Sequence, residues 1–155
     1  MSTTSSRLLA VCASLALMAG AIRAADKSGS VVKVTATADK PGADGTQVIN
    51  VTLEPQKSWH VYANPVGNVD LVDAQTTVTV TGKSKPEVVK IEYPAGTEIK
   101  DKVVGNYKVY EEKTTIKVTI KRAKGDTEKV EIGVRLQACN DKNCLAGDVV
   151  KVSVP

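Results

Sequence analysis

Residues 114–121 read TTIKVTIK, a stretch in which polar and apolar side chains alternate one by one. In an extended chain Ile116, Val118 and Ile120 point to one side, and the Thr and Lys side chains point to the other. Such alternation of β-branched residues is typical of a half-buried β-strand. Residues 129–137, KVEIGVRLQ, follow the same pattern. We therefore expect both segments to be strands that turn one face to a hydrophobic core.

The same alternation recurs along most of the chain. Further strands are predicted at residues 31–37, 47–54, 59–63, 76–82, 87–93 and 149–154. Turn-forming sequences separate them, for example PGADG at 41–45 and KGD at 124–126. About eight or nine strands in roughly 130 residues predict an all-β fold, an immunoglobulin-like antiparallel β-sandwich over residues 31–155.

The composition excludes several classes of function. Of 155 residues, 42% are hydrophobic and 25% are charged, so the chain is neither disordered nor a multi-span membrane protein. Aromatic residues make up 3%, too few for a surface that stacks on nucleic-acid bases. Basic and acidic residues alternate at a net charge of +4, which argues against a phosphate-binding stripe. We therefore expect no nucleic-acid partner.

The first 24 residues have the pattern of a secretory signal. Residues 1–7 are polar and end in Arg7, and residues 8–22 are small and apolar. This apolar run of about 15 residues is shorter than the ~20 that a spanning helix needs. An uncleaved amino-terminal anchor is the alternative. We expect a cleavable signal peptide at 1–24, a leader at 25–30, and a mature chain without a membrane span in the periplasm or another exported location.

Two cysteines are expected in the mature chain. Cys12 lies inside the apolar run and would be lost with the signal, which leaves Cys139 and Cys144 in a compartment that favours disulfides. The pair flanks the polar turn NDKN at 140–143, between two predicted strands. Antiparallel Cα atoms across such a turn lie ~4.5–5.5 Å apart, a separation that a disulfide tolerates.

The residues alone leave three interpretations of this pair open. A purely structural disulfide in a non-redox binding domain is the first, although so small a loop would gain only ~2 kcal/mol. A metal site for zinc or copper is the second, but Cys139, Cys144 and His60 supply three ligands where tetrahedral zinc takes four. A redox-active pair is the third, and it requires a sulfur that a thiolate can reach.

Two segments taken together resemble a known family. The stretch QACNDKNCLAG at 137–147, with SWHVYANP at 58–65 upstream, is similar to the amino-terminal periplasmic domain of the thiol:disulfide interchange protein DsbD. The resemblance implies an immunoglobulin-like sandwich that transfers electrons through a dithiol and needs no bound cofactor. Its partners would be thioredoxin-fold proteins or domains and exported disulfide-bearing proteins. If the pair is redox-active, the chain is an electron carrier of the protein-disulfide reductase type.

The resemblance also implies roles for individual residues. Cys144 would form the mixed disulfide with a partner, and Cys139 would resolve it. His60 and Tyr62 would support the pair from one face of a strand, with Trp59 turned toward the core. The residue type itself leaves two roles open for His60. It acts on a thiol proton, because the pKa of a histidine lies near the working pH, or it is a polar residue at the rim with no part in the chemistry.

A loop that covers the disulfide in the family corresponds to residues 101–105 of this chain. Its members are Asp101, Lys102, Val103, Val104 and Gly105. The family carries an aromatic residue at the position of Val103. We therefore expect the smaller valine to shield the sulfurs less well.

Overall fold

Antiparallel strands make up most of the computed structural model, which describes residues 26–155. The predicted signal peptide at residues 1–24 lies outside these residues. The elements are η1 (Ser28–Ser30), β1 (Val32–Ala38), β2 (Thr46–Pro55), β3 (His60–Tyr62), η2 (Val69–Ala74), β4 (Thr77–Gly82), β5 (Glu87–Glu92), β6 (Thr97–Ile99), β7 (Tyr107–Tyr110), β8 (Thr114–Lys121), β9 (Val130–Leu136), β10 (Ala138–Cys139) and β11 (Asp148–Val154). Within residues 26–155, no helix has the length and apolar character to cross a membrane.

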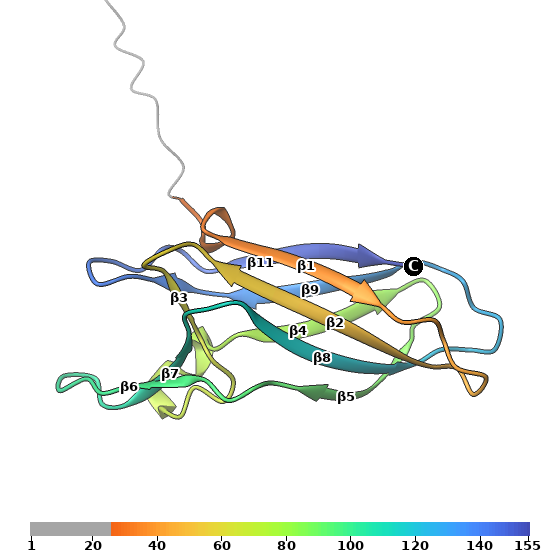
Figure 1. Cartoon of the computed structure of the whole chain (residues 1–155), viewed down its shortest axis with the longest axis horizontal. Coiled ribbons are helices and arrows are strands. Elements are labelled where there is room, and N and C mark those ends of the chain that lie inside the picture. The colour runs from red at the N-terminus through yellow and green to blue at the C-terminus, as the bar shows by residue number, and fades with distance from the viewer. Residues whose placement is uncertain (1–25) are drawn as a thin grey trace, which may run out of the picture.

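The strands form three sheets. Their orders are β1-β2-β8-β5, β11-β9-β4 and β10-β3-β7-β6. The first two are the layers of a sandwich, and the third lies at the end away from the carboxyl terminus, where β3, β6 and β7 are labelled (Figure 1). The predicted all-β antiparallel sandwich is therefore confirmed. The small third sheet was not expected, because its strands have only two to four residues each.

The core lies between the two large sheets, where the alternation places it. Ile116 and Ile120 of β8 are fully buried, as are Val130 and Ile132 of β9. All four belong to one hydrophobic cluster to which both layers contribute. Complete burial of each such side chain stabilises the fold by about 1.5–3 kcal/mol. The core thus holds the sandwich together without help from the cysteines.

The chain leaves the large sheet immediately before the first cysteine. The strand predicted for residues 129–137 is present as β9, which ends at Leu136, and the short strand β10 that follows pairs with β3. In that pairing Ala138 lies opposite Val61, and Cys139 lies opposite His60. This change of sheet brings the cysteine hairpin to the end of the sandwich, beside β3 in the SWHVYANP segment at residues 58–65.

Candidate redox site

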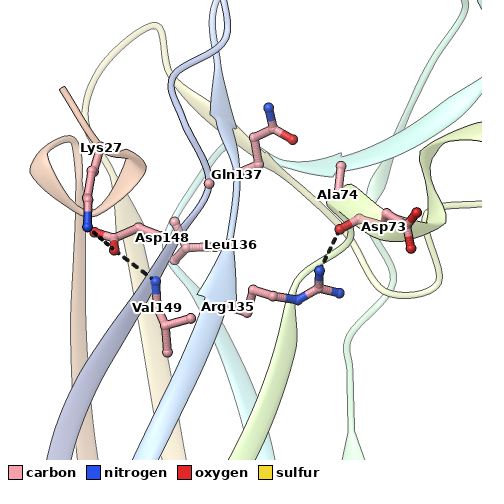
Figure 2. Close-up of a pocket in the computed structure, with 9 residues that line it drawn as sticks. Lys27, Asp73, Ala74, Arg135, Leu136, Gln137, Asp148 and Val149 are labelled. Atoms are coloured by element: carbon pink, nitrogen blue, oxygen red, sulfur yellow. Dashed lines mark hydrogen bonds and ion pairs between the residues drawn. The ribbon is translucent and has the colours of Figure 1, made fainter. Parts of the chain in front are cut away.

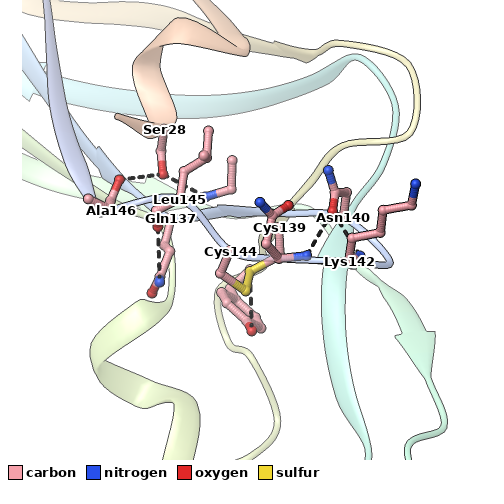
Figure 3. Close-up of a disulfide and its surroundings, with 11 residues drawn as sticks. Ser28, Gln137, Cys139, Asn140, Lys142, Cys144, Leu145 and Ala146 are labelled. Carbon is pink, nitrogen blue, oxygen red and sulfur yellow. Dashed lines mark hydrogen bonds between the residues drawn. A yellow bond between two sulfur atoms is a disulfide. The ribbon is translucent and has the colours of Figure 1, made fainter. Parts of the chain in front are cut away.

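The two cysteines form a disulfide across a tight hairpin (Figure 3). Their Cα atoms are 4.0 Å apart, and the residues are antiparallel bridge partners. The turn is fixed by Asn140, whose side-chain oxygen accepts hydrogen bonds from the amides of Lys142 and Asn143, each at 2.9 Å. The Asn140 amide also donates to the Asn143 carbonyl at 2.9 Å. The polar turn therefore brings the two cysteines together as predicted, with Cα atoms closer than the ~4.5–5.5 Å expected for antiparallel partners.

The two ends of this disulfide differ in their access to solvent. Cys139 is only 3% exposed and packs with Tyr62, Val66 and Val109 in a small hydrophobic cluster. Cys144 is exposed. A molecule that approaches from solvent therefore meets Cys144 first.

Tyr62 contacts the buried sulfur. Its hydroxyl lies 3.6 Å from Cys139 Sγ, and because a disulfide sulfur carries no proton, the hydroxyl is the donor. Burial raises the pKa of Tyr62, so the hydroxyl keeps its proton at neutral pH. The ring also packs against Tyr107, with centroids 5.6 Å apart. The buried sulfur thus has a fixed hydrogen-bond donor.

His60 lies on the same side of β3 as Tyr62, as the alternation predicted. The two rings meet edge to face with centroids 6.4 Å apart. Burial lowers the pKa of His60, and the carboxylates of Glu111 and Asp141 oppose that effect. The imidazole is therefore neutral at pH 7 and has a nitrogen free to accept a proton.

Trp59 and Val61 lie on the side of β3 opposite His60 and Tyr62. Val61 is fully buried in the main core, and the partly buried Trp59 packs against the same cluster. The expected placement of Trp59 is therefore confirmed.

The loop at residues 101–105 lies between β6 and β7, on the edge of the third sheet opposite β10. One carboxylate oxygen of Asp101 accepts hydrogen bonds from the amides of Val104 and Val103, which lower the pKa of Asp101. The Val104 carbonyl accepts a hydrogen bond of 2.7 Å from the Asn68 side chain. Val103 is 92% exposed, and its neighbours Lys102 and Gly105 in the same turn are also exposed. The loop is thus tied to the start of η2.

Tyr107, which the sequence did not single out, connects this loop to the disulfide. It follows the loop directly on β7 and packs against Tyr62, which in turn contacts Cys139. Burial raises the pKa of Tyr107, and the charge of Asp101 adds to the rise. The alternation of Tyr107 with the buried Val109 was the available signal, but the strand was too short to be recognised.

An open cavity of about 460 Å³ lies beside the base of the hairpin (Figure 2). Arg135 donates to the Asp73 carbonyl at 2.8 Å, and Lys27 lies 3.9 Å from an Asp148 carboxylate oxygen. These two contacts hold the walls of the cavity together, and the side chains that make them offer no nucleophile. Within residues 26–155, no cluster of three or more His, Cys, Asp or Glu side chains is arranged to hold a metal ion.

Comparison with known proteins supports the fold. The reduced N-terminal domain of DsbD from Neisseria meningitidis aligns with a TM-score of 0.50 at 16% identity, over 81% of this chain and 85% of that chain. The N-terminal periplasmic domain of ScsB from Proteus mirabilis aligns with a TM-score of 0.50 at 14% identity, over 79% of this chain and 43% of the ScsB chain. This chain thus spans less than half of that ScsB structure. At such identities the likeness shows the fold alone.

The sequence itself identifies the family. A search of curated proteins finds no match. The family model described as "Thiol:disulfide interchange protein DsbD, N-terminal" matches residues 29–154, which include both cysteines, β3 and the loop at residues 101–105. The chain therefore belongs to the family of DsbD N-terminal domains.

Proposed function

We propose that the chain is an exported thiol-disulfide interchange domain that transfers two electrons through Cys139 and Cys144. The observation that carries the proposal is the unequal exposure of the pair, with Cys144 open to solvent and Cys139 3% exposed. A purely structural disulfide does not need one accessible sulfur. Disulfide exchange does, because a thiolate must reach a sulfur of the bond.

The exchange is a pair of substitutions at sulfur. In the oxidised domain, a partner thiolate attacks Cys144 Sγ, forms a mixed disulfide with it and displaces the Cys139 thiolate. A second thiolate of the partner then attacks the partner sulfur of that mixed disulfide and releases the Cys144 thiolate. The partner leaves with a disulfide, and the domain holds two thiols after protonation. The reverse sequence oxidises the domain and reduces a partner disulfide through the same atoms.

Two side chains support this chemistry in the proposal. Tyr62 donates its hydroxyl hydrogen to Cys139 Sγ and so stabilises the thiolate that leaves. A better-stabilised leaving thiolate departs faster. His60, which pairs with Cys139 across the strands, serves as the proton acceptor when the thiols ionise, because burial keeps its imidazole neutral.

The partners we propose are thioredoxin-fold proteins or domains and exported proteins that bear disulfides. Membership of the family supports this assignment, and the predicted signal at residues 1–24 supports a periplasmic or other exported location. Only sulfur is needed for the electron transfer, so no bound cofactor is part of the proposal.

We also propose that the loop Asp101–Gly105 shields the Cys139 end of the disulfide indirectly, from the edge of the third sheet opposite β10. The Val103 amide donates to the Asp101 carboxylate and the Asn68 side chain donates to the Val104 carbonyl, and both contacts restrain the loop. Because Val103 is in solvent, the shielding would pass through Tyr107, whose ring lies against Tyr62.

The test is to trap the mixed disulfide. A Cys139→Ser variant keeps the attacking thiol of Cys144. It should form a stable covalent complex with a thioredoxin-fold protein that retains only its exposed active-site cysteine, activated as a mixed disulfide with a small aromatic thiol. Attack by Cys144 displaces the small thiol, and without a second cysteine the partner cannot release Cys144. The matched Cys144→Ser variant should accumulate little, because its remaining thiol is buried. Absence of any adduct with Cys139→Ser across a set of such partners would refute the proposed function.

A further inference from the structure

Ser28, near the start of the described chain, contacts both limbs of the cysteine hairpin (Figure 3). Its hydroxyl donates to the Ala146 carbonyl at 2.8 Å and accepts from the Ala138 amide at 2.8 Å. The Ser28 amide donates to the same Ala146 carbonyl at 2.9 Å. Ala138 lies directly before Cys139, and Ala146 lies two residues after Cys144. One side chain therefore closes the base of the redox loop.

A hydroxyl group suits this place because it donates and accepts at once. Ser28 is fully buried, so both of its hydrogen bonds are shielded from water. The segment at residues 25–30 was expected to be a leader before the first strand, and its sequence gives no periodic signal of burial. The structure instead places the 3-10 turn η1 within it and fixes that turn to the hairpin.

We propose that Ser28 is a positioning residue that sets the reduction potential of the Cys139–Cys144 pair. This inference rests on the proposed function. In the oxidised domain the S–S bond itself holds the two limbs together. In the reduced domain that bond is gone. The hydrogen bonds that the Ser28 hydroxyl makes with Ala138 and Ala146, which we call the Ser28 clamp, then keep the two thiols close. The Leu145–Ala138 and Asn140–Asn143 backbone hydrogen bonds act in the same way. The clamp therefore limits the conformations of the dithiol more than those of the disulfide.

Removal of the clamp should then favour the dithiol. The reduced hairpin gains freedom that the oxidised hairpin cannot gain, so the disulfide becomes easier to reduce. Because the two equilibria are linked, the clamp raises the equilibrium constant for forming the disulfide by the same factor as the disulfide raises that for forming the clamp. A side chain that only stabilised the fold would weaken both redox states equally and leave the equilibrium unchanged.

The experiment measures the equilibrium of the purified protein with glutathione. In this reaction one protein disulfide and two glutathione thiols give one protein dithiol and one glutathione disulfide. We expect Ser28→Ala to shift the equilibrium toward the dithiol by about tenfold, which equals a potential about 30 mV less negative. Ser30→Ala is the matched control, because the Ser30 hydroxyl bonds only to Lys27 in the same turn. It should leave the potential unchanged.

A second measurement covers the case in which Ser28→Ala does not fold. Amide hydrogen exchange of the reduced wild-type protein should show Ala138 protected, because its amide stays bound to the Ser28 hydroxyl. Unchanged potential in Ser28→Ala, or free exchange at Ala138 in the reduced protein, would overturn the inference. Trapping with Cys139→Ser reports separately on the proposed function, so a failure of either claim can be recognised.

Discussion

The hydroxyl of Tyr62 lies 3.6 Å from the sulfur of Cys139, on the buried side of the disulfide. This contact gives the two sulfurs different chemical surroundings within a single hairpin. Attack is directed to Cys144, the exposed residue of the pair, and the sulfur of buried Cys139 has a donor ready for the negative charge that attack leaves behind.

Replacement of Tyr62 by Phe should slow reduction of the disulfide by about fivefold, since one hydrogen bond to the leaving sulfur is worth about 1 kcal/mol. The rate of reduction by dithiothreitol under pseudo-first-order conditions measures this. Tyr93→Phe is the control, because the Tyr93 hydroxyl accepts from the Val78 amide and lies outside the site cluster. Equal rates for Tyr62→Phe and the wild type would show that the hydroxyl does not assist the departing thiolate.

The reduced protein should be alkylated selectively at Cys144. Because Cys144 is exposed and Cys139 is packed in a hydrophobic cluster, we expect iodoacetamide to modify Cys144 at least about tenfold faster. Mass spectrometry of the peptides after a short pulse distinguishes the two sites. Similar labelling of both cysteines would contradict the assignment of attack to Cys144.

The folded protein should lose stability as the pH falls below 6.5. Burial lowers the pKa of His60, so between that lowered value and 6.5 the unfolded chain binds a proton that the folded chain does not. Stability therefore falls as pH falls through this window and is unaffected by His60 above it. Urea unfolding at pH 7.5 and at pH 5 measures the loss. His60→Gln should reduce the loss, and an identical loss in the variant would mean that His60 is not responsible.

The alternation of the sequence was sufficient to predict the strands of the large sheets, but not the order in which they pair. In β8 and β9 each apolar residue of the pattern is buried, because the two faces of a strand are set by the local order of residues. The conformation of the turn at residues 140–143 is likewise set by residues that are neighbours in the sequence. The hydrogen bonds that the Asn140 side chain accepts lie within these four residues, so the proximity of Cys139 and Cys144 could be predicted.

The remaining features of the site depend on contacts between distant segments. Gln137 continues the alternation of β9, and nothing in the local sequence shows that Ala138 should pair with β3 instead. Ser28 reaches the hairpin across 110 residues of sequence, from a stretch without periodicity. Tyr107 lies on a strand of four residues, too short for the pattern to be distinctive. These features decide access and orientation at the sulfurs, and only the fold reveals them.

Release of the loop Asp101–Gly105 should make the disulfide easier to reach. Asp101→Ala removes the two hydrogen bonds that hold the turn, so we expect reduction by a small thiol to become about threefold faster, an effect comparable to the loss of one or two weak hydrogen bonds. Val103→Ala should have little effect, because this side chain is 92% exposed. Lys102→Ala is the control for a change of charge in the same turn. An unchanged or slower reaction in Asp101→Ala would contradict the shielding role of the loop. A larger effect of Val103→Ala would show that the valine and not Tyr107 provides the cover.

The reduction potential of the wild-type pair separates exchange from a structural role. Structural disulfides of exported proteins lie below about −300 mV, whereas bonds that exchange have less negative potentials. The loop closed by Cys139 and Cys144 is short, and the core is fully formed by the two large sheets, so the bond adds little that the fold lacks. We therefore expect a value less negative than about −300 mV from equilibration with glutathione or dithiothreitol. A value below that limit, together with a clear loss of stability of the Cys139→Ser and Cys144→Ser variants relative to the oxidised wild type, would instead assign the disulfide to a non-redox binding domain.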